Sequence, residues 1–297
     1  MKKLKVLDLF SGIGGFSLGL EKTGGFETIA FSEIDEFPKK TLQKNFPNVV
    51  NLGDVTKIDF STVEADVICG GFPCTDISIA SKTGDGIYGK RSGLWNEYFR
   101  AIGVIRPRYC IIENVFGLLG RGLEKVLHDL AQIGYDATWT VIDSQYTGVP
   151  QRRRRVYILG VRDGIPYNSD IFQLAERDRK ECRSKVESFK QSIKWNFKES
   201  EGDRHTFAYF TRQRSNEFAC AGVSSTLTKR DYKDFTDIVL QNGVLRRVTP
   251  LERLRLQGFP DDWFPNGSET EKFMYNGMTV PAVTWIGERL LDYERQV

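Results

Sequence analysis

A cysteine and a glutamate stand in two short segments that each come directly after an apolar run. Cys74 ends the stretch Gly70–Cys74, and Glu113 begins the stretch Glu113–Val115. A cysteine thiolate is a soft, strong nucleophile, so Cys74 suits addition to an electron-poor carbon such as carbon 6 of a pyrimidine. The addition pushes negative charge into the ring, where a carboxyl group sharing a proton and a nearby cation would lower the barrier. The two residues therefore predict covalent catalysis on a pyrimidine ring.

The setting of Cys74 differs from that of the neighbouring cysteines. Cys69 and Cys110 are embedded in apolar runs, so we interpret them as small buried hydrophobic residues. Cys74 instead follows Pro73, which fixes one backbone dihedral and can hold the thiol in one pose. A buried Glu113 would be costly without a partner, which favours an active role, and a carboxylate that caps the next helix is the alternative.

A run of four arginines supplies candidate cations. If the run enters a strand, alternation sends Arg153 and Arg155 to one face and Arg152 and Arg154 to the other. We expect one of these pairs to face solvent.

Eight motifs follow one another along nearly the whole chain. They are Asp8–Gly15, Ser32–Asp35, Gly53–Val55, Pro73–Cys74, Glu113–Val115, Gln151–Arg155, Thr249–Pro260 and Asn276–Pro281. Their order and spacing resemble the bacterial- and phage-type DNA (cytosine-5)-methyltransferases. The resemblance implies an enzyme that transfers a methyl group from S-adenosylmethionine to carbon 5 of a flipped-out cytosine in a specific double-stranded DNA sequence. It also implies a covalent Cys74 adduct at carbon 6 and S-adenosylhomocysteine as product.

The resemblance carries further roles onto matching residues. It brings Arg153 and Arg155 into the site, with Arg155 on the cytosine carbonyl, and leaves Arg152 and Arg154 to solvent. The chain departs from the family pattern at Thr75, where glutamine is usual, and at Tyr275, where glycine is usual. The predicted catalytic residues are Cys74, Glu113, Arg153, Arg155, Pro73 and Asn114.

The cofactor end begins at a glycine turn that lets backbone approach a bound molecule. Ser17 stands where the dinucleotide fingerprint needs its third glycine, which disfavours a nicotinamide oxidoreductase. Glu33 could accept ribose hydroxyls and Asp54 an adenine amine, and two acids without a phosphate anchor suit S-adenosylmethionine. The resemblance places Phe10 against the adenine, whereas without it Phe10 is more simply a core residue. The predicted cofactor contacts are Phe10, Ser11, Gly12, Ile13, Gly14, Glu33, Ile34, Asp54, Val55, Leu94, Asn276 and Gly277.

DNA contacts are predicted from a glycine-rich loop and from basic clusters. Four glycines with adjacent cations between Ile79 and Gly93 predict a lid over DNA. The clusters in Arg177–Lys185, Tyr209–Arg214 and Ser224–Lys233 are candidates to read bases, and a solvated face is the alternative for each. The predicted DNA contacts are Ser78, Lys82, Lys90, Arg91, Arg212, Arg214, Thr226, Leu227, Lys229 and Arg230, and no metal ligands are predicted.

The strands and helices that would position these residues are expected to alternate along the chain from Leu4 to Val161. Short apolar runs and helical stretches predict βα units, hence an α/β, doubly wound, mostly parallel sheet; the resemblance implies the Rossmann-like methyltransferase fold. Residues 1–162 form the expected catalytic and cofactor domain, 163–245 a smaller irregular target-recognition domain, and 246–297 a segment returning to the first. Predicted strands are Leu4–Phe10, Glu27–Ser32, Ala65–Gly70, Tyr109–Glu113, Ala137–Asp143 and Val156–Val161. Predicted helices are Phe16–Thr23, Phe37–Asn45, Leu94–Ile105, Leu123–Ile133 and Pro281–Glu294, with a further helix starting at Thr249–Pro250.

Composition limits the remaining possibilities. The 297 residues have a formal charge of only +3, so nucleic-acid affinity must come from local clusters. Five cysteines without a CxxC pair argue against a disulfide framework and a four-ligand zinc site, which fits a cytoplasmic protein. No apolar run approaches a membrane span of about 20 residues, and we expect a monomer from a bacterial cell. A phage or prophage origin and a cognate restriction endonuclease stay open.

Two alternatives stay open besides the oxidoreductase. An RNA cytosine-5 methyltransferase would share Cys74 and Glu113, but the chain lacks the Cys-Phe-Thr motif that marks that branch. A non-catalytic DNA-binding regulator would not need both residues. The recognised sequence and the base that removes the carbon 5 proton do not follow from the sequence.

Overall fold

Two compact units make up the chain in the computed structural model. Unit 1 comprises residues 1–142, 154–173 and 283–297, and unit 2 comprises residues 143–153 and 174–282. The predicted boundaries differ from these units, since 143–153 groups with unit 2 and only the part of 246–297 from residue 283 onward groups with unit 1. The structure describes residues 2–73, 93–172, 206–210, 218–220, 224–227, 237–241, 244–275 and 277–296.

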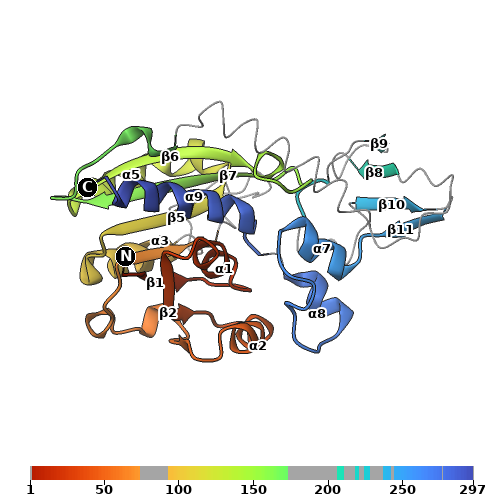
Figure 1. Cartoon of the computed structure of the whole chain (residues 1–297), viewed down its shortest axis with the longest axis horizontal. Coiled ribbons are helices and arrows are strands. Elements are labelled where there is room, and N and C mark those ends of the chain that lie inside the picture. Colours follow the sequence, from red (N-terminus) through yellow and green to blue (C-terminus); the bar gives the residue numbers. More distant parts are fainter. Residues whose placement is uncertain are drawn as a thin grey trace. The chain divides into compact units, whose positions relative to one another are not determined.

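Unit 1 is built on a seven-stranded sheet in the order β3-β2-β1-β4-β5-β7-β6 (Figure 1). The first five of these pair in parallel, whereas β7 runs antiparallel to β5. β1, β4 and β5 are buried along nearly their whole length, as expected for strands covered on both faces. The strands are β1 (Leu4–Leu9), β2 (Phe26–Ser32), β3 (Val50–Asn51), β4 (Val67–Gly70), β5 (Tyr109–Val115), β6 (Tyr135–Asp143) and β7 (Arg154–Arg162).

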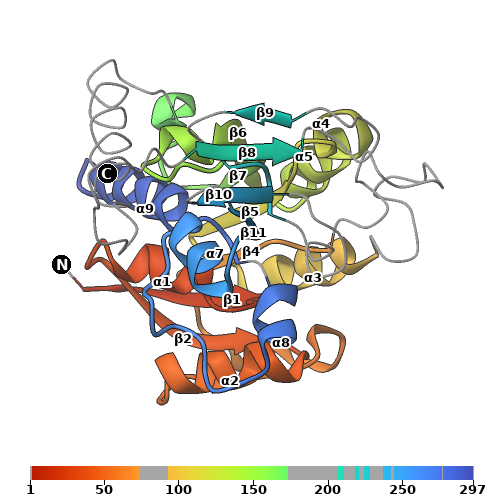
Figure 2. The ribbon, with the colours of Figure 1, turned by 90° about the vertical axis from the view of Figure 1, so that its right-hand side faces the viewer.

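Helices cover both faces of this sheet. α1 and α9 lie on one face and α3 and α5 on the other (Figures 1 and 2). The Thr284 hydroxyl of α9 donates to the carbonyl of Gly19 in α1 at 3.0 Å. The doubly wound α/β prediction is therefore confirmed. The helices are α1 (Gly15–Glu21), α2 (Glu36–Asn45), α3 (Leu94–Ile105), α4 (Leu118–Arg121), α5 (Leu123–Gln132) and α9 (Val280–Glu294), with 3-10 turns Val55–Lys57, Phe60–Thr62, Ser144–Tyr146 and Ser169–Phe172.

The elements predicted for the first half are present with small shifts at their ends. The strand predicted to begin at Val156 begins two residues earlier, at Arg154, so the arginine run enters the sheet. Among the residues the structure describes, no helix combines the length and apolar character needed to cross a bilayer.

Unit 2 contains a four-stranded sheet in the order β11-β10-β8-β9, with every neighbouring pair antiparallel. The sequence showed no clear period in this region, because strands of three to five residues are too short to produce one. The predicted helix start is confirmed, since Thr249 and Glu252 form a capping box at α7. The elements are β8 (Thr206–Phe210), β9 (Phe218–Cys220), β10 (Asp237–Gln241), β11 (Val244–Arg247), α7 (Pro250–Leu256) and α8 (Glu269–Met274).

Candidate active site

The site residues of unit 1 lie at one edge of the sheet. From β1 the chain builds β2 and β3 on one side and then β4 and β5 on the other, so the strand order reverses between β1 and β4. In open α/β sheets, ligands bind outside the carboxyl ends of the strands at such a reversal. The segments that follow β1, β2 and β4 there are the predicted motifs at Phe10, Glu33 and Gly71.

The glycine turn after β1 has an unusual backbone. Phe10 has φ 54°, a left-handed conformation that a bulky residue seldom adopts, and Gly12 and Gly14 have φ 54° and 84°. The Phe10 ring is half-buried and stacks at 6.3 Å, centroid to centroid, on Tyr98. Phe10 also packs against the main core, and its contact with a flat ligand remains a prediction.

The Asp8 side chain stabilises this turn through hydrogen bonds to α1, a role that the sequence reasoning missed. Its carboxyl group is fully buried and accepts from the Ser17 hydroxyl at 2.8 Å and the Ser17 amide at 3.3 Å. Burial raises the pKa of Asp8 to about 8, partly offset by these hydrogen bonds. Asp8 thereby ties the end of β1 to α1 across the turn.

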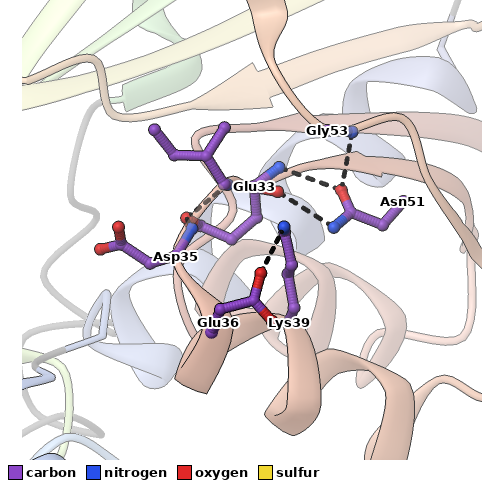
Figure 3. Close-up of polar contacts among 7 residues, drawn as sticks. Glu33, Asp35, Glu36, Lys39, Asn51 and Gly53 are labelled. Atoms are coloured by element: carbon purple, nitrogen blue, oxygen red, sulfur yellow. Dashed lines mark hydrogen bonds and ion pairs between the residues drawn. The ribbon is translucent and has the colours of Figure 1, made fainter.

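The Glu33 carboxylate accepts from backbone amides of two loops, and Figure 3 draws the contacts within its own loop. Oε2 accepts from Gly12 N–H at 2.8 Å, while Oε1 accepts from Ile34 N–H at 2.8 Å and Asp35 N–H at 2.7 Å. The predicted ribose acceptor is thus fixed beside the glycine turn. The Ile34 side chain next to it is 62% exposed, available to cover a bound ligand.

Asp54 stands at the start of the 3-10 turn Val55–Lys57. Its Oδ1 accepts from the amide and the hydroxyl of Thr56 at 3.0 and 2.8 Å. These hydrogen bonds, the backbone one first, lower the pKa of Asp54, which favours the ionised acceptor predicted for an adenine amine. Val55 is buried and packs in the main core, so its predicted contact would come from backbone.

The remaining predicted cofactor contacts divide between the two units. Ser11 is buried and its hydroxyl donates to the Asp8 carbonyl at 2.6 Å, and Ile13 is 1% exposed in the core. Leu94, the first residue of α3, packs against the core of unit 1. Gly277 is buried in unit 2, and Asn276 lies outside the described residues.

The exit of β4 leads toward the predicted nucleophile. A Cβ at Gly70 would lie 2.2 Å from the Leu9 carbonyl oxygen, so only glycine permits this close approach of β4 to β1. Phe72 is 2% exposed, and its carbonyl accepts from the Asn114 side-chain amide at 3.1 Å. Asn114 therefore fixes the segment carrying Pro73, while Cys74 itself lies outside the described residues.

Glu113 and Arg155 meet because β7 runs antiparallel to β5. The register pairs Val115 with Arg155, so the start of β7 lies beside the end of β5. Arg155 Nε lies 3.0 Å from Glu113 Oε1, with both side chains largely buried. Glu113 Oε2 would lie only 2.5 Å from a Cβ at Gly71, so the carboxylate rests on the backbone of the segment that continues to Cys74.

The four arginines alternate as predicted. Arg152 and Arg154 are exposed, Arg153 is 9% exposed and Arg155 is partly buried. The Arg154 guanidinium lies 3.9 Å from the centroid of the Phe116 ring.

Arg153 belongs to unit 2, where its backbone is held on both sides. Its N–H donates to Asp143 Oδ1 at 3.1 Å, and its carbonyl accepts from Ser144 N–H at 3.1 Å. Its predicted catalytic role remains a prediction.

Two of the predicted DNA contacts can be located. The Thr226 hydroxyl donates to the Arg152 carbonyl at 2.7 Å. The Leu227 side chain is 2% exposed in a small cluster with Val248 and Leu256, so its position serves packing. Ser78, Lys82, Lys90, Arg91, Arg212, Arg214, Lys229 and Arg230 lie outside the described residues.

The other cysteines of unit 1 behave as interpreted. Cys69 and Cys110 are fully buried, and burial raises the pKa of the Cys110 thiol to about 12 and also raises the pKa of the Cys69 thiol well above its ordinary range. Neither forms a thiolate readily near neutral pH.

Comparison with known proteins identifies the family. The model of C-5 cytosine-specific DNA methylases matches residues 4–292. The chain belongs to this family. This match confirms the predicted family and enzyme class. It also confirms the predicted activity, methylation of cytosine carbon 5 in DNA.

Individual relatives of this DNA methylase align over nearly its whole length. It is 32% identical to the Type II methyltransferase M1.ScrFI of Lactococcus lactis subsp. cremoris, over 98% of this chain and 78% of the relative. It is also 32% identical to the Type II methyltransferase M.NgoBI of Neisseria gonorrhoeae, over 94% of this chain and 90% of the relative.

Solved structures support the fold. The Schizosaccharomyces pombe (S. pombe) Dnmt2 methyltransferase superposes with a TM-score of 0.74 at 18% identity, over 98% of this chain and 99% of its own. The Entamoeba histolytica methyltransferase EhMeth gives a TM-score of 0.69 at 17% identity, over 98% and 99%. At these identities the likeness concerns the fold alone.

Proposed function

We propose that this chain transfers a methyl group from S-adenosylmethionine to a cytosine flipped out of double-stranded DNA, through a covalent bond to Cys74. The observation that carries the proposal is the Glu113–Arg155 pair, which rests on Gly71 three residues before Cys74. A carboxylate and a guanidinium held at the exit of the strand that leads to a thiol match the needs of addition to a pyrimidine.

The chemistry assigned to these residues balances in four steps. The Cys74 thiolate forms a bond to carbon 6 while the ring electrons move toward N3, where Glu113 shares a proton and Arg155 faces the carbonyl oxygen. Carbon 5 becomes the nucleophilic end of an enamine and forms a bond to the methyl group, while the bond from that methyl group to the sulfonium sulfur breaks and S-adenosylhomocysteine is the leaving group. The carbon 5 proton then leaves to a base, and the bond from carbon 6 to the Cys74 sulfur breaks, which restores the aromatic ring and the thiolate.

The residues at the carboxyl ends of β1 to β3 fit S-adenosylmethionine. When bound, this cofactor supplies an electrophilic methyl group on a sulfonium. The left-handed turn at Gly12 and Gly14 leaves room for close approach of the ligand, and Phe10 offers an aromatic face. Glu33 and Asp54 offer hydrogen-bond acceptors for the nucleoside, and a cationic, phosphate-free ligand suits this acidic pair.

Duplex DNA is the proposed partner, and the target cytosine must leave the base stack because both faces of its ring have to be reached. Extrusion of the base costs a few kcal/mol, which contacts to the flanking DNA would offset. We assign those contacts to the segment between Ile79 and Gly93 and to the basic segments of unit 2. We further propose that the protein acts as a monomer within a restriction–modification system, as the Type II relatives suggest.

Transfer of labelled methyl groups tests the substrate. Purified protein with tritiated S-adenosylmethionine should label duplex DNA and leave tRNA unlabelled. Bisulfite sequencing of DNA from expressing cells should then locate the modified cytosines. Label on tRNA alone would reverse the substrate assignment.

The Cys74→Ser variant tests the nucleophile. It should lose methyl transfer entirely and keep its affinity for S-adenosylhomocysteine, because the thiol is needed only for the adduct. Cys220→Ser is the matched control, and it should retain activity and trap 5-fluorocytosine duplex as the wild type does. Mass spectrometry that places the trapped adduct on any side chain but Cys74, or finds none, would refute the mechanism.

A further inference from the structure

The Asn51 side chain connects two loops of unit 1 that the proposed function places around the cofactor. Asn51 is the last residue of β3, and its Oδ1 accepts from Glu33 N–H at 3.1 Å and from Gly53 N–H at 3.1 Å. Its Nδ2 donates to the Glu33 carbonyl at 3.0 Å (Figure 3). One amide group therefore satisfies three backbone groups on two segments that are 18 residues apart in the sequence.

These bonds matter because β3 is too short to hold the segment alone. It has two residues, paired with β2 at Ala30–Val50 and Phe31–Asn51, and it ends the sheet on that side. By exchanging both an N–H···O and a C=O···H–N bond with the Glu33 backbone, the Asn51 amide acts as one more rung of the ladder beyond the last paired residues.

A connected set of polar contacts results at the carboxyl ends of three adjacent strands. The carboxylate of Glu33, which follows β2, accepts from the Gly12 amide after β1. The Glu33 backbone bonds to Asn51 at the end of β3, and Asn51 accepts from the Gly53 amide just before Asp54. The Ser32 hydroxyl adds a bond to the Gly53 carbonyl at 2.8 Å. The distance between the Glu33 and Asp54 carboxylates thus depends on Asn51.

We propose that Asn51 is a positioning residue for the nucleoside half of the cofactor. It does not itself need to touch the ligand. It fixes the Glu33 and Asp54 acceptors at one spacing, so that the ordering of the two loops is complete before the ligand binds. This inference rests on the proposed function, because it assumes that those two carboxylates receive the ribose and the adenine.

Two variants and one control test the inference. Asn51→Ala removes all three bonds, whereas the nearly isosteric Asn51→Asp keeps the acceptors but turns a carboxylate oxygen toward the Glu33 carbonyl. Asn48→Ala removes an exposed asparagine three positions earlier on the same segment. Calorimetric titration with S-adenosylhomocysteine should show a Kd raised about tenfold for both Asn51 variants and unchanged for Asn48→Ala.

Further measurements separate positioning from general support of the fold. With duplex DNA saturating, the Asn51 variants should raise the KM for the methyl donor and keep kcat within about twofold of the wild type. In a Glu33→Ala background, Asn51→Ala should add less than about twofold to Kd, since one of the two carboxylates whose spacing Asn51 fixes is gone.

The outcomes are distinguishable. Wild-type affinity in both Asn51 variants overturns the inference, and so does a full, additive loss in the Glu33→Ala background. A fall in kcat as large as the rise in KM, together with melting near the assay temperature in both variants, would indicate that Asn51 only supports the fold. That result would also overturn the inference. Wild-type protein that binds no S-adenosylhomocysteine would instead overturn the proposed cofactor, and this inference with it.

Discussion

Replacing Gly71 with alanine should displace the Glu113 carboxylate while leaving the fold intact. The new Cβ would lie 2.5 Å from Glu113 Oε2 and 3.7 Å from its Cδ. To reach the 3.4 Å of an ordinary contact, the oxygen must retreat by about 0.9 Å. The end of a glutamate side chain can rotate that far, so we expect the free energy of unfolding to change by no more than about 1 kcal/mol.

Activity should respond much more strongly than stability. Glu113 Oε1 pairs with Arg155 Nε at 3.0 Å, and a retreat of this size disturbs both that pair and the carboxylate's reach toward the ring. A misplacement near 1 Å can cost about 100-fold in rate, so we expect kcat of Gly71→Ala to fall by about that factor. Single-turnover methyl transfer to duplex DNA measures the chemical step directly, and calorimetry with S-adenosylhomocysteine should show an unchanged Kd.

The matched control is Gly103→Ala in α3. No atom lies within 4 Å of the added Cβ, and the position is exposed, so helix stability should rise by about 0.5–1 kcal/mol and activity should not change. In a Glu113→Gln background, Gly71→Ala should add little further loss, because the two changes act on one group. Wild-type kcat in Gly71→Ala, or a full additional loss in that background, would refute the assigned role of the Glu113 position.

Two further predictions concern single ionisable groups. Arg155→Ala should lower kcat about 100- to 1000-fold, because it removes the cation that pairs with the buried Glu113 carboxylate. The control Arg154→Ala changes an exposed residue, and its kcat should stay within about threefold of the wild type. Equal losses of kcat in a methyl-transfer assay would contradict this prediction. Burial raises the pKa of Asp8 to about 8, so the folded state holds this proton more tightly than the unfolded state and stability from Asp8 is lost as pH rises toward and through 8. Urea unfolding should show Asp8→Asn gaining on the wild type between pH 5 and pH 9, and a stability difference that does not vary with pH would count against this assignment.

The sequence predicted the strands of unit 1 well because their residues form nearly continuous apolar runs. Val6 to Leu9 and Tyr109 to Ile112 are buried almost completely, and such runs identify strands covered on both faces. The motif order added the site residues at the strand ends. Short strands gave no such signal, which is why the antiparallel sheet of unit 2 was interpreted as irregular.

Residues that act only through tertiary contacts were not predictable. Asp8 looks like the end of a strand, and its importance follows from the Ser17 groups that it accepts from. Asn51 looks like an ordinary residue near a loop, because its partners Glu33 and Gly53 meet it only after β2 and β3 pair. A polar residue's periodicity and spacing do not specify which backbone groups it will satisfy.

The direction of β7 explains why the arginine of the site comes from so far along the chain. An apolar run does not encode whether a strand runs parallel or antiparallel to its neighbour, so Val156–Val161 was predicted as a strand without a direction. Had β7 run parallel to β5, its first residues would lie at the amino end of β5, away from Glu113. Because it runs antiparallel, with Val115 opposite Arg155, the start of β7 lies beside the end of β5. The Glu113–Arg155 pair therefore depends on the antiparallel direction of β7. A shift of this register by one residue would turn Arg154 inward in place of Arg155 and separate the Glu113 carboxylate from its cation.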